Sequence, residues 1–208
     1  MTAVPGTGLN DCWKVMGGVQ RSAGGFIWAL VGEGVVRDGR GGAIDTTGNR
    51  APEGILGPFR EREASFHTIR DIWAPLQLTN PGYYASTFPA GFDKTVEVVN
   101  NYGFTNVSQC GFTWRLLRYN SPGSGSGRSI VAEGAFTGPD IAPGARSALS
   151  LDLPADWATA DALTVTTRDP SGRQVGAWTW RIKKAAEHAA RLVVPSRAVS
   201  PRSRTPPR

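Results

Sequence analysis

The chain has 208 residues, of which 40% are hydrophobic, enough for a globular core, and its 26 glycines and 15 prolines exclude a helical bundle. The net charge of +6 suggests nucleic-acid binding, but residues 185–208 alone carry five arginines and one glutamate. The rest of the chain is nearly neutral, so we expect no nucleic-acid partner. No apolar run reaches membrane-spanning length and no signal peptide is visible, so we expect no membrane partner and a cytoplasmic location by default.

The first third of the chain predicts a helix, a buried strand, a long loop and a second helix. Apolar residues at steps of three and four predict a helix over 9–19, and the unbroken apolar run 24–31 predicts a strand buried on both faces. Residues 32–58 are rich in glycine and polar groups and indicate a long ordered loop. A second amphipathic stripe predicts a helix over 61–74.

From about residue 83 apolar residues recur at every second position, which indicates strands with one buried and one solvent-exposed face. Turn signals separate the strands at spacings typical of an antiparallel sandwich. We predict six or seven strands between 83 and 184, with the clearest alternation at 95–98, 113–116, 149–153, 163–166 and 177–182. We predict that the tail 185–208 is disordered, because its composition of proline, serine and arginine from residue 195 onward cannot bury a core; its alanine-rich start is also compatible with a short helix.

Three segments in the first third form a linked set of motifs: Gly24-Gly25-Phe26-Ile27-Trp28, residues 53–63 (EGILGPFRERE) and residues 68–75 (TIRDIWAP). In order and spacing they resemble family 2 glycoside hydrolases of the β-galactosidase type. The resemblance implies an α+β multidomain fragment: residues 1–78 would be the last strand and helices of a (β/α)₈ barrel. Residues 79–184 would be an antiparallel, immunoglobulin-like β-sandwich, followed by the tail 185–208.

A retaining glycosidase needs two carboxyl groups about 5–5.5 Å apart in one pocket. The resemblance places the nucleophile at or just before Met1, so that both catalytic glutamates are missing and the chain alone is predicted to be inactive. We expect Asp38, Asp45 and Glu53 on the long loop to be solvated rather than catalytic. No cofactor is expected in this chain, because the family's use of Mg²⁺ or Na⁺ would involve upstream residues.

Trp28 is the strongest candidate for contact with a substrate. In the resembled family this position forms part of the galactose pocket wall, where a flat indole faces the C–H groups of a sugar. Glu53 stands near a polar pocket position of some relatives, and Arg60 matches a basic residue that follows. The other interpretations are barrel core for Trp28 and a surface polar pair for Glu53 and Arg60. The implied partners are a β-galactoside or related carbohydrate and an upstream enzyme chain.

A second hypothesis is a non-catalytic module in which the sandwich binds a carbohydrate or a protein. Its weakness is that Trp114, Trp178 and Trp180 all lie in strand phases compatible with the core. The histidines and cysteines do not suggest a catalytic or metal site. His67 is expected to be a packed or rim residue. Cys12 and Cys110 are expected to be buried thiols, without a disulfide or a zinc site.

Overall fold

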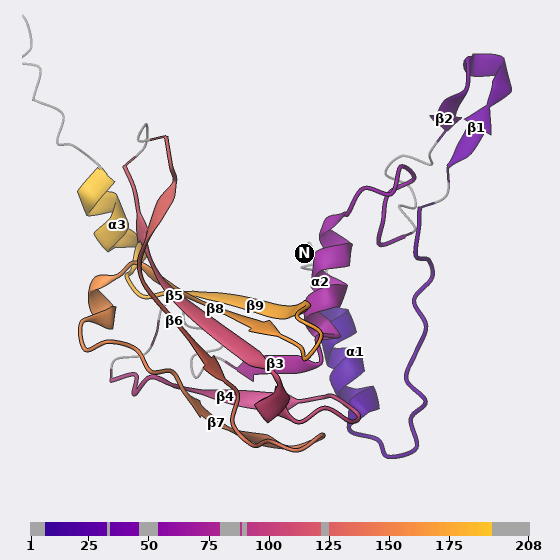
Figure 1. The fold of residues 1–208 in the computed structure, drawn as a ribbon. Coiled ribbons are helices and arrows are strands. Elements are labelled where there is room, and N and C mark those ends of the chain that lie inside the picture. The colour runs from indigo at the N-terminus through magenta and orange to yellow at the C-terminus, as the bar shows by residue number, and fades with distance from the viewer. Residues whose placement is uncertain are drawn as a thin grey trace, which may run out of the picture. The chain divides into compact units, whose positions relative to one another are not determined.

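The computed structural model describes residues 7–32, 34–45, 54–79, 88, 91–121 and 125–192 (Figure 1). The chain divides into two compact units, Met1–Ala74 and Pro75–Arg208, and each is described by itself. Among the described residues, no helix has both the length and the apolar composition needed to span a membrane.

Two helices in the first unit confirm the helices expected from the sequence. Helix α1 spans Thr7–Gly17 and α2 spans Ala64–Ile72. The rings of Trp13 on α1 and Trp73, the residue that ends α2, lie 5.1 Å apart in a tilted arrangement. The apolar stripe of each helix therefore contributes to one aromatic contact, as helical periodicity predicts.

The strand expected over 24–31 is wrong: the segment has no regular strand, and only Val31 forms an isolated parallel bridge, with Leu56. Instead of being buried on both faces, Phe26, Trp28 and Leu30 are exposed. The physical reason is that a strand of a parallel sheet is defined by neighbours on both sides. Within the described residues, only 55 and 56 donate or accept backbone hydrogen bonds with 29–32.

The loop expected over 32–58 contains a small hairpin that the glycine content concealed. Strand β1 (Val35–Arg37) pairs antiparallel with β2 (Ala43–Asp45), and the 3₁₀ turn η1 (Asp38–Arg40) lies between them. Gly41 and Gly42 have positive φ angles of 65° and 77°, and the Gly42 amide donates to the Arg37 carbonyl. These glycines allow a tight reversal rather than an irregular loop.

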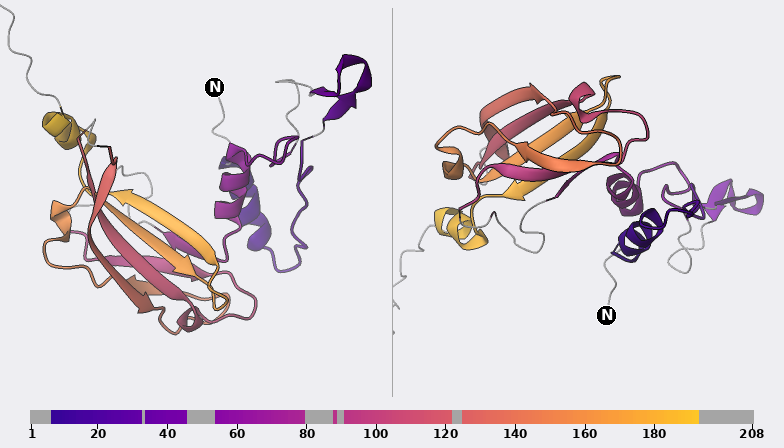
Figure 2. Two further views of the ribbon diagram at one scale, coloured as in Figure 1. Left: turned by 45° about the horizontal axis from the view of Figure 1, so that its top comes forward. Right: turned by 90° about the horizontal axis from the view of Figure 1, so that it is seen from below.

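The second unit is an antiparallel β-sandwich of two sheets, as the alternating sequence predicts. One sheet has the order β3 (Leu76–Thr79), β4 (Thr95–Asn100), β7 (Arg146–Ser150). The other has the order β6 (Arg128–Thr137), β5 (Gly111–Tyr119), β8 (Ala162–Arg168), β9 (Gln174–Arg181). Figure 2 shows these sheets as two facing layers.

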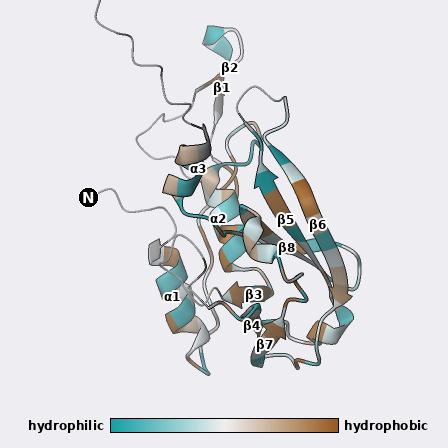
Figure 3. Cartoon of the chain, turned by 90° about the vertical axis from the view of Figure 1, so that its left-hand side faces the viewer, coloured by the Kyte–Doolittle hydropathy of each residue, from teal (hydrophilic) through white to brown (hydrophobic). Residues whose placement is uncertain are grey.

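The core lies between the two sheets because successive residues of each strand point to opposite faces. Strand β4 alternates half-buried and buried positions along its whole length. Hydrophobic segments are visible on β3, β5 and β7 in Figure 3. The most deeply buried apolar side chains are Leu76, Val96, Val98, Val107, Phe112, Leu116, Leu151, Leu163 and Val165.

The sandwich differs from the expected boundaries at both ends. Strand β3 begins at Leu76, ahead of the predicted start at residue 79, because Leu76 and Leu78 alternate into the core opposite β4. Residues Ala185–Leu192, the alanine-rich start of the tail, form helix α3, so the part predicted to be disordered begins later than residue 185. The Glu187 carboxylate accepts a hydrogen bond from the Lys184 amide at 2.7 Å, which stabilises the start of this helix. The rest of the tail, 193–208, lies outside the described residues.

Candidate functional site

The extended segment that carries Trp28 is attached to the following loop along one side. The Leu56 amide donates to the Leu30 carbonyl at 3.0 Å, and the Gly32 amide donates to the Leu56 carbonyl at 2.7 Å. A Cβ atom at Gly54 would overlap the backbone of Val31 and Gly32, so the glycine allows this close approach. The first and second sequence motifs are therefore neighbours in space.

Three alternate residues of this segment present large apolar side chains. The exposed fractions are 104% for Phe26, 79% for Trp28 and 63% for Leu30. The peptide bond between Trp28 and Ala29 is cis. Several large apolar side chains exposed close together are unusual on the surface of a soluble protein. They indicate a surface that another protein segment or chain covers.

A tight turn follows in the second motif and presents a further aromatic residue. The Glu61 carboxylate accepts a hydrogen bond from the Phe59 amide at 2.9 Å, and the Gly57 amide donates to the Glu61 carbonyl at 2.9 Å. Arg60 has a φ of 70°, in the left-handed region, and Phe59 is 69% exposed. Glu61 is thus occupied in holding the turn, which leaves Phe59 and Arg60 at the surface.

The backbone places two of the loop acids at different ends of the β1–β2 hairpin. Asp38 lies in the exposed turn η1, whereas Asp45 pairs with Val35 at the other end of the hairpin. Glu53, the second residue predicted to contact substrate, lies outside the described residues. In the described part of the chain no group of three or more His, Cys, Asp or Glu side chains could hold a metal ion.

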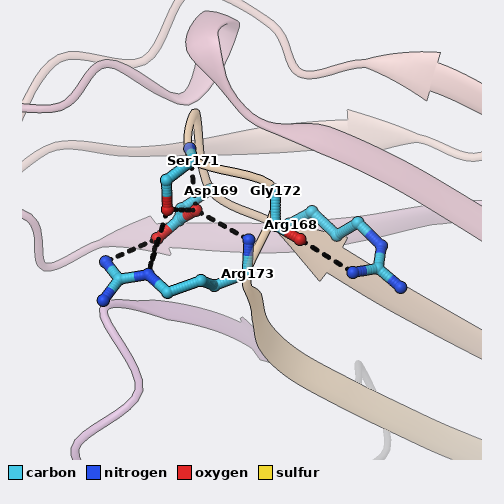
Figure 4. A network of polar contacts seen from close by, with 5 residues as sticks. All are labelled: Arg168, Asp169, Ser171, Gly172 and Arg173. Atoms are coloured by element: carbon cyan, nitrogen blue, oxygen red, sulfur yellow. Dashed lines mark hydrogen bonds and ion pairs between the residues drawn. The ribbon is translucent and has the colours of Figure 1, made fainter.

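The densest polar network was not predicted and closes the turn between β8 and β9 (Figure 4). Asp169 Oδ1 accepts hydrogen bonds from the Ser171 amide, the Ser171 hydroxyl and the Arg173 amide. The hydrogen bond from the Ser171 side chain is the largest of the effects that lower the Asp169 pKa to about 2. The carboxylate is ionised and fully engaged, so the network is a structural element and offers no general base.

Two acid–base side chains near this turn are held in their neutral forms. Burial is the main cause that raises the pKa of both the Tyr102 phenol and the Cys110 thiol, and the negative charge of Asp169 adds to it. A neutral buried thiol is a poor nucleophile. Both cysteines are free, but only Cys110 is buried; Cys12 is exposed, contrary to expectation, because it lies on the outward side of α1.

A second buried carboxylate, also missed in the sequence, joins the ends of three sandwich strands. Asp161 is fully buried; its Oδ2 accepts the Tyr119 amide at 2.8 Å, and its Oδ1 lies 3.6 Å from Lys183 Nζ. Its carbonyl also accepts the Ile182 amide. These contacts tie β5, β8 and β9 together, and we assign them a structural role. In the sequence, Asp161 is simply an aspartate before the alanine that begins a strand, and this pattern is too common to predict its role.

The sandwich tryptophans lie where the strand phases predict. Trp114 is 7% exposed, and Trp178 and Trp180 pack against the core, so these rings form no external platform for a sugar. Phe104, in the loop after β4, is an exposed aromatic residue of this unit, with an exposed fraction of 100%. His67 is exposed on α2 beside the Phe66 ring, as expected for a rim residue.

No protein-family model matches the chain, and no curated protein matches it in sequence. Among solved structures, it is similar to the exo-chitosanase CsxA of Amycolatopsis orientalis in complex with PNP-beta-D-glucosamine, with 16% identity and a TM-score of 0.36. That match covers 63% of this chain and 14% of the exo-chitosanase. The ligand binding region of Serine-glutamate repeat protein A of Enterococcus faecium is similar at 17% identity and a TM-score of 0.27, covering 52% of this chain and 90% of that one.

The similar structures thus include a glycosidase. This chain spans only about a seventh of the exo-chitosanase, which was solved as a complex with a β-D-glucosamine derivative. At these identities and TM-scores the similarities assign neither a reaction nor a substrate to this chain.

Proposed function

We propose that this chain is the C-terminal part of a family 2 glycoside hydrolase of the β-galactosidase type. Beside the strands of the upstream chain, residues 24–31 would become the last strand of its catalytic barrel, the helices up to residue 75 would complete that barrel, and the sandwich would be the domain that follows. The intact enzyme would hydrolyse terminal β-galactosides or related β-glycosides by the retaining mechanism. The proposal rests first on the three linked sequence motifs between residues 24 and 75.

One structural observation carries the proposal furthest: within the described part of the chain, the end of the apolar run 24–31, at residues 29–32, is hydrogen-bonded along one side only. The bonds link it to residues 55 and 56, and its bridge to Leu56 is parallel, as between strands of a (β/α)₈ barrel. Phe26, Trp28 and Leu30 are exposed along the run. Further parallel strands would cover Phe26 and Leu30, as in a barrel core, and leave Trp28 for the pocket.

The same arrangement explains why catalysis would depend on upstream residues. A retaining glycosidase requires two carboxyl groups about 5–5.5 Å apart. In the described part of the chain, the acids nearest the exposed segment in sequence lie at opposite ends of the β1–β2 hairpin. The nucleophile and the acid/base would therefore come from strands that precede residue 24, and so would the ligands of any Mg²⁺ or Na⁺.

Trp28 would serve as an aromatic wall of the sugar pocket. Barrel enzymes assemble their sites at the carboxyl ends of the strands, and Trp28 lies in the second half of the segment 24–31. Its exposed indole offers a flat apolar face that suits the C–H face of a pyranose. Glu53 would approach the same pocket from the loop that follows.

Joining the chain to the sequence encoded upstream of Met1 tests the proposal. The expected upstream sequence contains barrel strands with two glutamates, and the joined protein hydrolyses p-nitrophenyl β-glycosides, the β-galactoside and the β-glucosaminide being assayed side by side. The 208-residue chain alone is expected to give no turnover. An upstream region without barrel sequence, or turnover by the chain alone, would contradict the proposal.

Substitution of Trp28 tests its assigned role in the joined protein. Trp28→Ala is expected to lower kcat/KM by about tenfold or more through the lost stacking contact. Phe104→Ala is the matched control, since Phe104 is also an exposed aromatic residue but lies in the sandwich unit. Equal activities for the two variants would remove Trp28 from the pocket.

A further inference from the structure

The tip of the β1–β2 hairpin holds a sequence pair with its own chemistry. Asp38 is followed by Gly39, and this is the one place in the chain where glycine follows an aspartate or an asparagine. The pair lies in the turn η1, in which no residue is buried. Neither the sequence resemblance nor the proposed function gives Asp38 a catalytic or binding role.

The surroundings of Gly39, whose amide nitrogen is the next one after Asp38, are uncrowded. A glycine has no Cβ to hinder an attack by this nitrogen, and the space around the Cβ position of Gly39 is open to at least 4 Å. Within the described residues, no hydrogen bond or ion pair holds the Asp38 side chain. Asp169, by contrast, is fixed by hydrogen bonds from Ser171 and Arg173 and is followed by a proline, which has no N–H.

The hairpin is also short enough to open easily. Three residue pairs hold it, from Val35 with Asp45 to Arg37 with Ala43. A two-stranded hairpin of this size is marginally stable on its own, so the turn samples the extended backbone that ring closure needs. Gly41 and Gly42, which have open space around them, add to this freedom.

We propose that Asp38 is a site of spontaneous isomerisation to isoaspartate. The Gly39 nitrogen attacks Cγ of the protonated Asp38 carboxyl group, an N–Cγ bond forms, and one water leaves with the amide proton and the hydroxyl group. Water then adds to the succinimide at Cγ, restoring aspartate, or at the backbone carbonyl carbon, giving isoaspartate. The net mass change is zero.

The product differs from aspartate in two ways that matter for the hairpin. Its backbone runs through Cβ and Cγ, so the chain gains one atom between Arg37 and Gly39, and the α-carboxylate becomes the side group. The added atom shifts the pairing of Arg37 with Ala43. The free α-carboxylate is the group that an isoaspartyl methyltransferase methylates, and such a repair enzyme is the partner that this site fits.

Incubation of the purified chain at mildly acidic pH and physiological temperature tests the proposal. Isoaspartate is then quantified by enzymatic methylation with labelled S-adenosylmethionine and located by electron-transfer mass spectrometry. We expect it to accumulate at Asp38 ahead of every other aspartate, including Asp169. Isoaspartate that is absent from residue 38, or no more abundant there than elsewhere, would overturn the proposal.

Gly39→Ala provides the matched variant. Gly39 does not have a positive φ, and its Cβ position is free, so the substitution leaves the hairpin intact. The added methyl group hinders the attack by the neighbouring nitrogen, and isomerisation at Asp38 is expected to fall by about tenfold. An unchanged rate in this variant would exclude the succinimide route.

Discussion

The guanidinium of Arg173 holds the carboxylate of Asp169 at the turn between β8 and β9: Nε donates to Oδ2 at 2.9 Å, and the terminal nitrogen lies 2.7 Å from the same oxygen. The two groups differ in environment, because the Asp169 side chain is 4% exposed and that of Arg173 is 80% exposed. Hydrogen bonds from Ser171 complete the site. The turn is thus organised by one buried charge.

This charge predicts a specific acid sensitivity of the sandwich. The pKa of Asp169 in the folded protein is about 2, below the ordinary value of 3.8. The unfolded chain therefore binds a proton first as the pH falls, and the stabilisation by Asp169 is present above 3.8 and is lost as the pH falls to about 2. In denaturant titrations, the difference in free energy of unfolding between the native chain and Asp169→Asn should shrink across this window. Asp152→Asn, on an exposed residue, is the control, and an equal shrinkage there would refute the assignment.

Asn100 is predicted to be critical for stability. It is fully buried, its Nδ2 donates to the carbonyls of Thr105 and Ile141, and its Oδ1 accepts the Tyr102 amide. Asn100→Ala would leave these groups without partners and should lower the free energy of unfolding by about 2–4 kcal/mol. The neighbouring Asn101→Ala, at an exposed position, should cost less than about 0.5 kcal/mol. Similar losses for both variants would contradict this account.

Substitution of two phenylalanines, one in the core and one at the surface, should have very different effects on stability. Phe112 on β5 is 1% exposed and stacks on Phe136, whereas Phe104 is 100% exposed. Phe112→Ala should lower the free energy of unfolding by about 3–5 kcal/mol through the cavity that it leaves. Phe104→Ala should change it by less than about 0.5 kcal/mol, measured by thermal or chemical unfolding. A large loss from Phe104→Ala would show that this ring is covered in solution.

Gly134 on β6 makes room for the indole of Trp114. An added Cβ would lie 2.6 Å from two ring carbons, and Trp114 is too buried to move away freely. Gly134→Ala should destabilise the sandwich by about 1–3 kcal/mol and change the tryptophan fluorescence. Gly111→Ala on β5, where the Cβ position is open, is the matched control. Equal effects of the two would reject the steric explanation.

The two cysteines should differ in reactivity. Cys12 is exposed, whereas Cys110 is buried and its thiol has a raised pKa. A thiol reagent at neutral pH should therefore titrate one group rapidly in the native chain and the second only after denaturation. Cys12→Ser should abolish the rapid phase. Rapid labelling of the Cys12→Ser variant would contradict the burial of Cys110.

Local patterns in the sequence determined much of the sandwich and both helices of the first unit. Alternation such as that of residues 95–98 specifies which face of a strand is buried, and the steps of three and four along 9–19 specify a helix. Both signals depend on neighbours along the chain, so they survive without knowledge of the fold. The motifs between residues 24 and 75 resemble those of family 2 glycoside hydrolases in order and spacing, and the proposed barrel rests on that resemblance.

Tertiary structure alone decided the properties that depend on partners distant in sequence. The apolar side chains of residues 24–31 favour burial, but a strand also needs hydrogen bonds from neighbouring strands. Among the described residues, only 55 and 56 supply such bonds. The Asp169 network also depends on a turn conformation that its residue types permit without dictating. Periodicity reports what a segment favours, and the available partners decide what it becomes.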